Sequence, residues 1–185
     1  PADGSVHEVH TIVSQALDAA AVRFHVDGYD SCARARAAAG DATASSLQRF
    51  NAAAVADGPI AVDAVTLRTV ELAKWVHSVS SDGRFDPTAC AAMDAWRRVL
   101  VEAKRRPNAE EVAGALAGKG LDGVAVDATA GTLRKVAHDA TRLDLGAIAK
   151  GQTVDDIVEE LQRRFGGGGI TGLLVEWGGD LRTMG

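Results

Sequence analysis

The stretch that decides the fold is Asp144-Leu-Gly-Ala-Ile-Ala-Lys-Gly151, together with the residues that follow it up to Phe165. Behind Lys150 the apolar residues recur every three or four positions, the spacing of an amphipathic helix with one buried face; they are Val154, Ile157, Val158, Leu161 and Phe165. A short strand over 143–145 is expected before this helix, and a buried strand over 170–177 after it, ended by two glycines. The stretch therefore predicts strand, tight turn, helix and strand.

The rest of the chain adds helices before this stretch and two strands next to it. Helical spacing and start signals predict helices over 8–21, 45–54, 63–79 and 89–104, and another that begins at Asn108 with Glu111 three residues later. Alternation of apolar residues predicts strands near 124–126 and over 132–137. Because helices dominate the first half, we expect an α+β fold with a mixed sheet packed with helices, as one domain over 1–185.

Composition and charge narrow the class of function. The chain has 185 residues, 46% of them hydrophobic, enough for a sizeable core. Its formal net charge of −5 disfavours nucleic acid as a partner, because neutralising phosphates needs a dense basic face. Without a long apolar run or a hydrophobic segment behind the polar start, we expect a soluble chain with no membrane span and no signal peptide, in a compartment that the sequence leaves open. Cys32 and Cys90 stand alone and indicate neither a disulfide framework nor a zinc site.

The segment 144–151 is the first candidate site. Gly146 lets the backbone approach a ligand closely, and the helix that follows presents amide groups and the positive end of its dipole, which suit a phosphate. Lys150 adds a positive charge, and Asp144 can accept hydrogen bonds from a sugar or base, or orient Lys150. The segment is neither a Walker A loop nor the Gly-x-Gly-x-x-Gly turn. An ordinary strand-to-helix turn with a salt-bridged lysine is the alternative.

Two further segments carry charged residues at turns. In Ser81-Asp-Gly-Arg-Phe-Asp-Pro-Thr88, Asp86 can face a ligand or simply cap the helix that Pro87 opens. In Glu176-Trp-Gly-Gly-Asp-Leu-Arg182, the strand end can line a cleft, or it can be a hairpin turn with an Asp180–Arg182 pair.

Taken in order, these segments resemble one family. Ser46-Leu-Gln-Arg-Phe-Asn51 is similar to its Ser-Glu-Leu-Ser-Arg-Leu-Asn element, and the 81–88 segment resembles Ser-Asp-Gly-Ala-Phe-Asp-Pro-Thr. The 144–151 segment resembles Asp-Leu-Gly-Gly-Ile-Ala-Lys-Gly, and 175–185 resembles Val-Asn-Ala-Gly-Gly-Asp-Ile-Arg-x-x-Gly. The family is that of the FAD:protein FMN transferases, the ApbE family, and the resemblance covers about three quarters of the chain.

The resemblance implies an activity and a set of site residues. A member binds FAD and Mg²⁺, a threonine hydroxyl of a target flavoprotein attacks the FMN phosphorus, and AMP leaves. The nucleophile comes from the partner, so no catalytic residue is assigned in this chain. The backbone carbonyl of Ala147 would be a metal ligand, and Asp180 and Arg182 would lie at the cleft edge. The residues that would line or contact FAD are Arg84, Phe85, Asp86, Asp144 and Lys150.

The sequence also departs from the family pattern. The opening strand with its Gly-Thr pair is not at 1–10, Gln152 stands where tyrosine is preferred, and the aromatic residue expected within 41–44 is missing, so that Tyr29, near an expected turn, would have to take its place. The family's later His-x-Ile-x-Asp-Pro-x-Thr-Gly element, with the Asp/Thr pair that completes the metal site, would lie beyond Gly185. The resemblance thus implies a domain incomplete at both ends, which needs the C-terminal segment for transfer.

Three alternatives to a free-standing transferase remain open. The chain can be an FAD-binding module without transfer activity, which Gln152 and the missing aromatic residue favour. It can also be a transferase domain fused to a flavoprotein reductase, such as a fumarate reductase. A structural domain that binds no nucleotide is the third.

Overall fold

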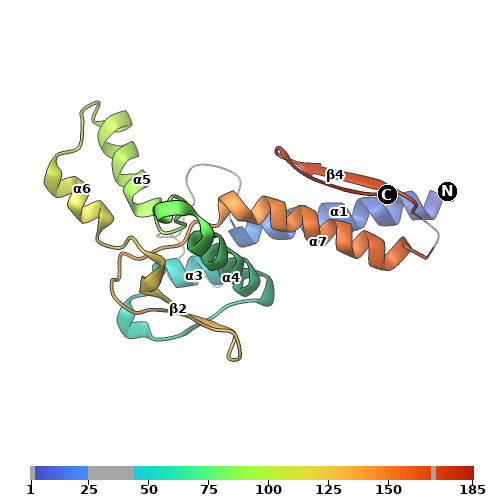
Figure 1. The fold of residues 1–185 in the computed structure, drawn as a ribbon, viewed down its shortest axis with the longest axis horizontal. Coiled ribbons are helices and arrows are strands. Elements are labelled where there is room, and N and C mark those ends of the chain that lie inside the picture. Colours follow the sequence, from blue (N-terminus) through green and yellow to red (C-terminus); the bar gives the residue numbers. More distant parts are fainter. Residues whose placement is uncertain (1–2, 25–43, 168–169) are drawn as a thin grey trace. The chain divides into compact units, whose positions relative to one another are not determined.

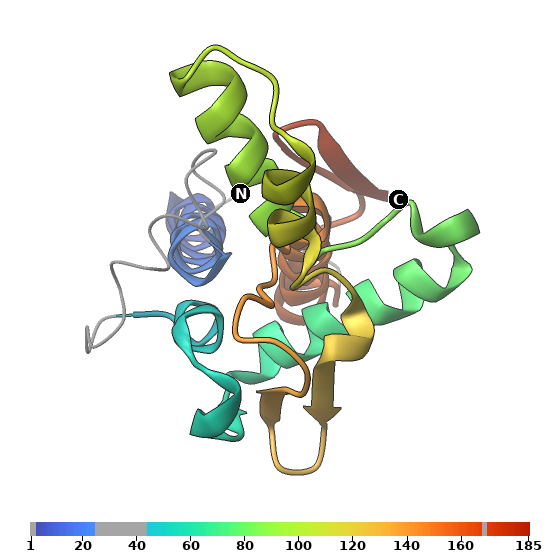
Figure 2. The same cartoon turned by 90° about the vertical axis from the view of Figure 1, so that its left-hand side faces the viewer.

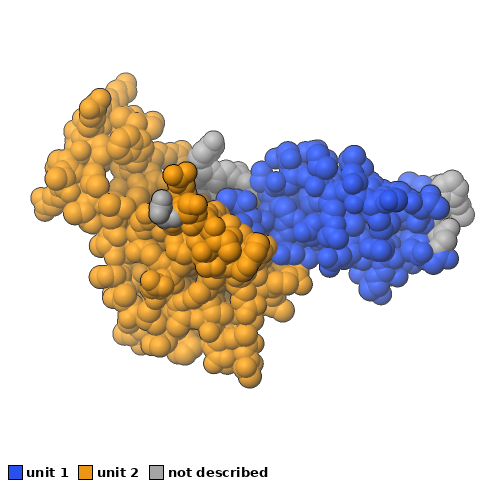
Figure 3. Space-filling model, in the orientation of Figure 1, with its two compact units in different colours: residues 1–27, 146–185 blue, residues 28–145 orange. Residues whose placement is uncertain are grey.

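The computed structural model describes residues 3–24, 44–167 and 170–185 (Figure 1). These residues form two compact units, unit 1 with residues 1–27 and 146–185 and unit 2 with residues 28–145 (Figure 3). We describe each unit by itself, and the single domain over 1–185 stays a prediction. The turn expected near Tyr29 lies outside the described residues.

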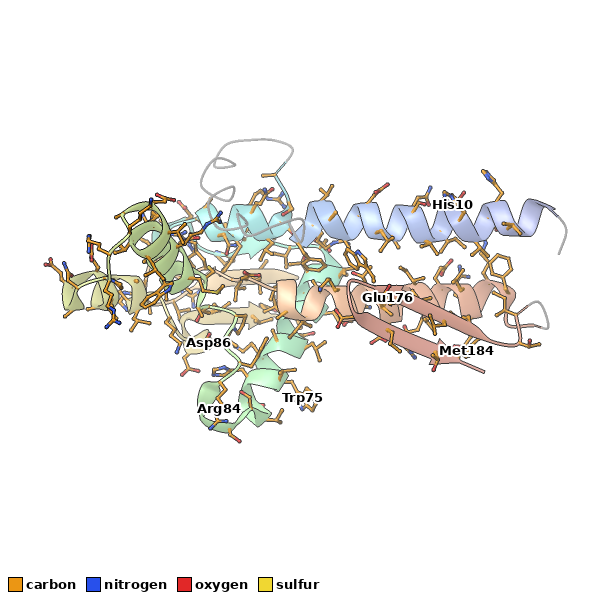
Figure 4. The ribbon with its side chains drawn as sticks, turned by 90° about the horizontal axis from the view of Figure 1, so that it is seen from above. His10, Trp75, Arg84, Asp86, Glu176 and Met184 are labelled. Carbon is orange, nitrogen blue, oxygen red and sulfur yellow. The ribbon has the colours of Figure 1, made fainter. Side chains whose placement is uncertain are left out.

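Unit 1 is a pair of helices with a β-hairpin. It contains α1 (Asp3–Phe24), α7 (Gly146–Phe165), β4 (Leu173–Trp177) and β5 (Asp180–Met184). Helix α7 lies between α1 and the hairpin (Figures 1 and 4). Four residues of its predicted apolar stripe are buried, namely Val154, Ile157, Val158 and Leu161. The amphipathic pattern therefore predicted the buried face of this helix correctly.

The predicted strand over 170–177 is shorter and more exposed than expected. It begins at Leu173 and pairs antiparallel with β5, from Leu173 opposite Met184 to Trp177 opposite Asp180. A two-stranded hairpin covered on one side leaves its other face open, so that Leu174 is 66% and Leu181 63% exposed. The expectation of a buried strand was wrong, because the residues of β4 alternate between half-buried and exposed and none of them is buried.

The described part of unit 2, residues 44–145, combines four helices of seven or more residues with a small antiparallel sheet. Its helices are α3 (Ser46–Ala52), α4 (Ala64–Val79), α5 (Cys90–Arg97) and α6 (Ala109–Leu116); α5 continues into a π-helical turn, η3 (Arg98–Glu102). Single 3₁₀ turns are η1 (Val55–Asp57), η2 (Ser81–Gly83) and η4 (Leu121–Gly123). The sheet has the order β1 (Ile60–Ala61), β3 (Thr132–Lys135), β2 (Val124–Asp127), with β2 and β3 forming a hairpin (Figure 2).

Three helices of unit 2, namely α3, α4 and α6, begin directly after a capping residue. Asn108 accepts a hydrogen bond from the backbone N–H of Glu111, whose side chain accepts one from the N–H of Asn108. Ser45 and Gln48 form the same arrangement at the start of α3, and the Asp63 carboxylate caps α4. These are local interactions, which is why the sequence signals them.

The core of unit 2 gathers residues from α3, α4, the sheet and the 143–145 segment. Its fully buried side chains include Phe50, Val70, Val124, Leu133, Leu143 and Leu145. The expected strand over 143–145 is absent, since these residues have no regular secondary structure. A strand needs a backbone partner, and the N–H and C=O of Leu143 are instead bonded to the side chain of Asn51. The α+β class is confirmed.

Among the described residues, no helix is both long and apolar enough to cross a membrane.

Candidate functional site

Unit 2 brings two of the predicted site segments into direct contact. The backbone N–H of Asp144 donates a hydrogen bond of 2.8 Å to the carbonyl of Pro87. Asp144 is therefore next to the segment that carries Arg84, Phe85 and Asp86, although about sixty positions of sequence lie between them. Sequence reasoning assigned both segments to one ligand, and in unit 2 they do lie together.

The carboxylate of Asp86 is almost entirely buried and anchors its own turn. The Asp86 side chain is 7% exposed. The Oδ1 atom accepts hydrogen bonds from the backbone N–H (2.9 Å) and the hydroxyl (2.5 Å) of Thr88, while Oδ2 lies 3.8 Å from Lys119 Nζ. The Thr88 hydroxyl oxygen in turn accepts from the N–H of Gly120 at 2.6 Å. The carboxylate thus joins the 81–88 segment to the loop after α6.

The capping role expected for Asp86 is only half right. Its carboxylate does accept from the backbone two residues ahead, as a capping aspartate would. Residues 87–89 form a turn, however, and α5 begins only at Cys90, so Pro87 does not open that helix. The Pro87 carbonyl accepts its hydrogen bond from the N–H of Asp144 instead of from a residue of a helix, so Pro87 stays in the turn.

Arg84 and Phe85 follow α4 and the single turn η2, and Arg84 is labelled in Figure 4. Arg84 is exposed and Phe85 is half-buried. Both polar groups of the Phe85 backbone contact the end of α4: the carbonyl lies 2.6 Å from His77 Nδ1, and the N–H donates to the Ser80 hydroxyl oxygen at 3.4 Å. Sequence reasoning missed His77 and Ser80, because nothing in their spacing marks them as partners of this turn.

Asn51 and Lys135 fix the loop that leads to Asp144. The Asn51 side-chain amide donates to the Leu143 carbonyl at 2.9 Å, and its oxygen accepts from the Leu143 N–H at 2.8 Å. Lys135 Nζ donates to three backbone carbonyls, those of Asn51 (3.0 Å), Ala53 (2.6 Å) and Asp139 (2.9 Å). Asn51 is the last residue of the 46–51 segment that resembles a family element. Its pairing with the backbone of Leu143 could not be inferred from the sequence.

In unit 1, Lys150 lies against the turn of the hairpin. Its Nζ donates to the Gly178 carbonyl at 3.1 Å and lies 4.0 Å from Asp180 Oδ2, and its side chain is 33% exposed. Gly178 has φ of 58°, and a Cβ atom there would lie 3.3 Å from the lysine nitrogen. The 144–151 and 176–182 segments thus meet at Lys150. The salt bridge expected under the alternative interpretation of this lysine is seen as its long contact with Asp180.

Arg182 of the hairpin pairs with α7 instead of with Asp180. Arg182 Nη1 lies 3.0 Å from Asp155 Oδ1 and 3.4 Å from Glu159 Oε1. The hydrogen bond to Asp155, followed by the negative charges of Asp155 and Glu159, raises the pKa of Arg182 above its ordinary value. The hairpin turn is confirmed, but Asp180 faces Lys150 rather than Arg182 as the hairpin interpretation expected.

Ala147, the predicted metal ligand, is exposed in the first turn of α7. Its carbonyl supplies one oxygen, whereas Mg²⁺ takes about six in an octahedron. Among the described residues, no group of three or more His, Cys, Asp or Glu side chains is placed to hold a metal ion.

Comparison with known proteins finds one matching family and several similar solved structures. The model of the ApbE family matches residues 12–185. The flavin transferase ApbE from Vibrio cholerae is 25% identical with a TM-score of 0.75, and the match covers 97% of this chain and 51% of that one. No curated protein sequence is similar enough to count as a match.

Two further solved structures have the same fold. They are the apo form of the Pseudomonas stutzeri flavinyl transferase ApbE (24% identity, TM-score 0.74, 100% of this chain and 51% of that one) and the ApbE protein from Thermotoga maritima (22%, 0.72, 97% and 51%). The chain thus spans about half the length of the solved structures that it matches. Since the family model matches nearly all of the chain, the chain belongs to the ApbE family.

Proposed function

We propose that this chain is part of an FAD:protein FMN transferase that attaches FMN to a threonine of a target flavoprotein. The threonine oxygen forms a bond to the FMN phosphorus, the bond from that phosphorus to the bridging oxygen breaks, and AMP leaves with the bridging oxygen. The hydroxyl proton goes to solvent or to a base that we do not assign. Membership of the ApbE family and the likeness to the Vibrio cholerae flavin transferase support this activity.

The observation that carries the proposal in unit 2 is the contact of Asp144 with Pro87. It makes the half-buried Asp144 a neighbour of the turn that bears Arg84, Phe85 and Asp86. We assign these four residues to FAD. The exposed guanidinium of Arg84 suits a phosphate, because it presents a fork of N–H donors, and a carboxylate such as Asp144 accepts hydrogen bonds from sugar hydroxyls or base amino groups.

In unit 1 we assign Lys150 and the start of α7 to phosphate. The ammonium group carries three N–H donors, and one hydrogen bond, to Gly178, is made within the unit. A 20-residue helix has four N–H groups at its start that lack helical partners, and its dipole favours an anion there. The positive charge of Lys150 one turn inside strengthens that preference.

Mg²⁺ enters the proposal through the Ala147 carbonyl. In phosphate sites this ion keeps water molecules and is held by one or two protein groups together with phosphate oxygens, so a single carbonyl of this chain fits a partial site. When bound, the ion would neutralise the charge of the pyrophosphate. Its further ligands would come from FAD and from water.

A second candidate, an FAD-binding module without transfer activity, is favoured by one residue. Gln152 stands where the family-like motif has tyrosine, and its side-chain amide donates to Asp156 Oδ1 at 3.0 Å, along the surface of α7. A transferase domain within a flavoprotein reductase differs from the free enzyme only in having its acceptor threonine on the same chain.

The first experiment is a titration with FAD, with and without Mg²⁺, followed by flavin fluorescence and calorimetry. We expect micromolar binding that Mg²⁺ tightens. Incubation with FAD, Mg²⁺ and a threonine-bearing acceptor flavoprotein should then release AMP and leave covalent flavin fluorescence on the acceptor. Binding without AMP release would support the second candidate. If neither this chain nor a longer form of the protein bound FAD, both candidates would be wrong.

A further inference from the structure

We propose that His77, in the last turn of α4, is a positioning residue that sets the turn bearing Arg84, Phe85 and Asp86. The proposal rests on the proposed function, because that turn matters here as an FAD-contacting segment. The contact that carries it is the distance of 2.6 Å between His77 Nδ1 and the Phe85 carbonyl oxygen. A carbonyl can only accept, so Nδ1 carries the hydrogen and donates it.

The turn is held to α4 through both polar groups of Phe85. The Phe85 N–H donates to the Ser80 hydroxyl oxygen at 3.4 Å, and that hydroxyl donates to the His77 carbonyl at 2.9 Å. The His77 ring closes the cycle by donating to the Phe85 carbonyl. Ser80 lies directly after the last helical residue, so the end of α4 acts as the fixed side of this cycle.

The Phe85 carbonyl is the group that matters for the site. It belongs to the planar peptide unit that leads into Asp86, so holding the oxygen fixes the direction in which the chain enters Asp86. Asp86 and Pro87 then make the bonds to Thr88 and Asp144. A rotation of this peptide would therefore displace Asp86 and Pro87, the two residues that join the turn to the rest of the unit.

Before Asp86, within residues 81–85, the turn has few contacts of its own. Within it, the Arg84 N–H donates to the Ser81 carbonyl at 3.3 Å, and Gly83 has φ of 62°, which glycine adopts without strain. A Cβ atom at Gly83 would lie 3.4 Å from Cε1 of the His77 ring, so the ring also packs beneath the turn. The imidazole thus supplies both a donor and a support to a segment with few internal bonds.

The test compares His77→Ala with His77→Asn. The asparagine amide nitrogen occupies nearly the place of Nδ1 and can donate to Phe85, whereas alanine cannot. We expect His77→Ala to weaken FAD binding about 3- to 10-fold, the usual effect of one hydrogen bond, and His77→Asn to restore most of it. His10→Ala, at an exposed histidine of α1, is the matched control and should leave the affinity unchanged.

Amide hydrogen exchange of residues 81–88 gives a second measurement that does not depend on FAD. We expect faster exchange in His77→Ala, and rates near those of the wild type in His77→Asn, while the thermal unfolding midpoint stays within a few degrees. If His77→Asn behaved like His77→Ala in both measurements, or if neither variant differed from the wild type, the positioning role would be overturned.

The two measurements separate this proposal from the proposed function. If the wild type failed to bind FAD, the proposed function would fail, and exchange alone would decide whether His77 holds the turn. If the wild type bound FAD and His77→Ala bound it equally well, the positioning role would fail while the proposed function stood.

Discussion

Two lysines, one in each unit, differ in how far their ammonium groups are used within the fold. Lys135 in unit 2 is 2% exposed, and its nitrogen donates to three carbonyls at 2.6 to 3.0 Å. Lys150 in unit 1 is 33% exposed, with one hydrogen bond of 3.1 Å and a carboxylate at 4.0 Å. An ammonium group has three donors. Those of Lys135 are used within the fold, whereas Lys150 retains capacity for a ligand, so the first is structural and the second is the better candidate for phosphate.

The largest effect that this comparison predicts is on stability, at Lys135. In Lys135→Met the three carbonyls lose a buried donor, and an unsatisfied buried group costs about 1–3 kcal/mol. We expect the free energy of unfolding in urea to fall by about 3 kcal/mol, with little change in the FAD affinity of the folded protein. Arg134→Met, at the exposed neighbour on β3, should cost less than about 0.5 kcal/mol. If the free energy of unfolding fell by less than about 1 kcal/mol in Lys135→Met, water would be donating to the three carbonyls in place of the lysine.

The reverse pattern is expected at Lys150. Lys150→Ala should weaken FAD binding by about 1.5–3 kcal/mol, the usual worth of a hydrogen bond to a charged group, and should barely change the urea midpoint. Arg163→Ala, near the other end of α7, should change neither quantity, because Arg163 forms an exposed pair with Glu160. A large loss of stability with unchanged FAD affinity would make Lys150 a second structural lysine.

Burial lowers the pKa of Lys135 to about 8 from its ordinary 10.5, and the positive charge of Arg142 adds to the effect. Between these pH values the unfolded chain binds more protons at this lysine than the folded chain does, so the free energy of unfolding rises with pH. Relative to Lys135→Met, we expect the wild type to gain on the order of 1–2 kcal/mol between pH 8 and 10, measured by urea unfolding. A flat difference would show that the three carbonyls keep the ammonium charged.

The smallest predicted effect concerns the turn that contacts Lys150. Gly178→Ala places a Cβ atom where φ is 58° and where the lysine nitrogen would be 3.3 Å away. We expect a loss of about 1 kcal/mol in the free energy of unfolding, and about half of that in Gly178→Asn, because asparagine tolerates this conformation better. Equal losses in the two variants would point to crowding of Lys150 rather than to backbone conformation.

The 144–165 segment and the 143–145 strand illustrate where sequence reasoning works and where it fails. The stripe of α7 was predicted because its residues share one face by spacing alone. The prediction of a strand over 143–145 was wrong, because a strand needs a backbone partner. The N–H and C=O of Leu143 are bonded instead to the side chain of Asn51, which lies 92 positions away. Proximity of the 81–88 segment to Asp144 was expected only from the family resemblance and is now seen as a hydrogen bond.

By itself, the sequence determined most of the helices, the cap of α6 and the order of the motifs, because capping and helical spacing act over three or four residues. Only the tertiary structure decided which lysine is buried, which acid faces Lys150, and that His77 holds Phe85. Each of these depends on how elements pack and on how many donors and acceptors remain for each polar group once water is excluded. Local patterns in the chain do not predict which polar groups become partners after packing.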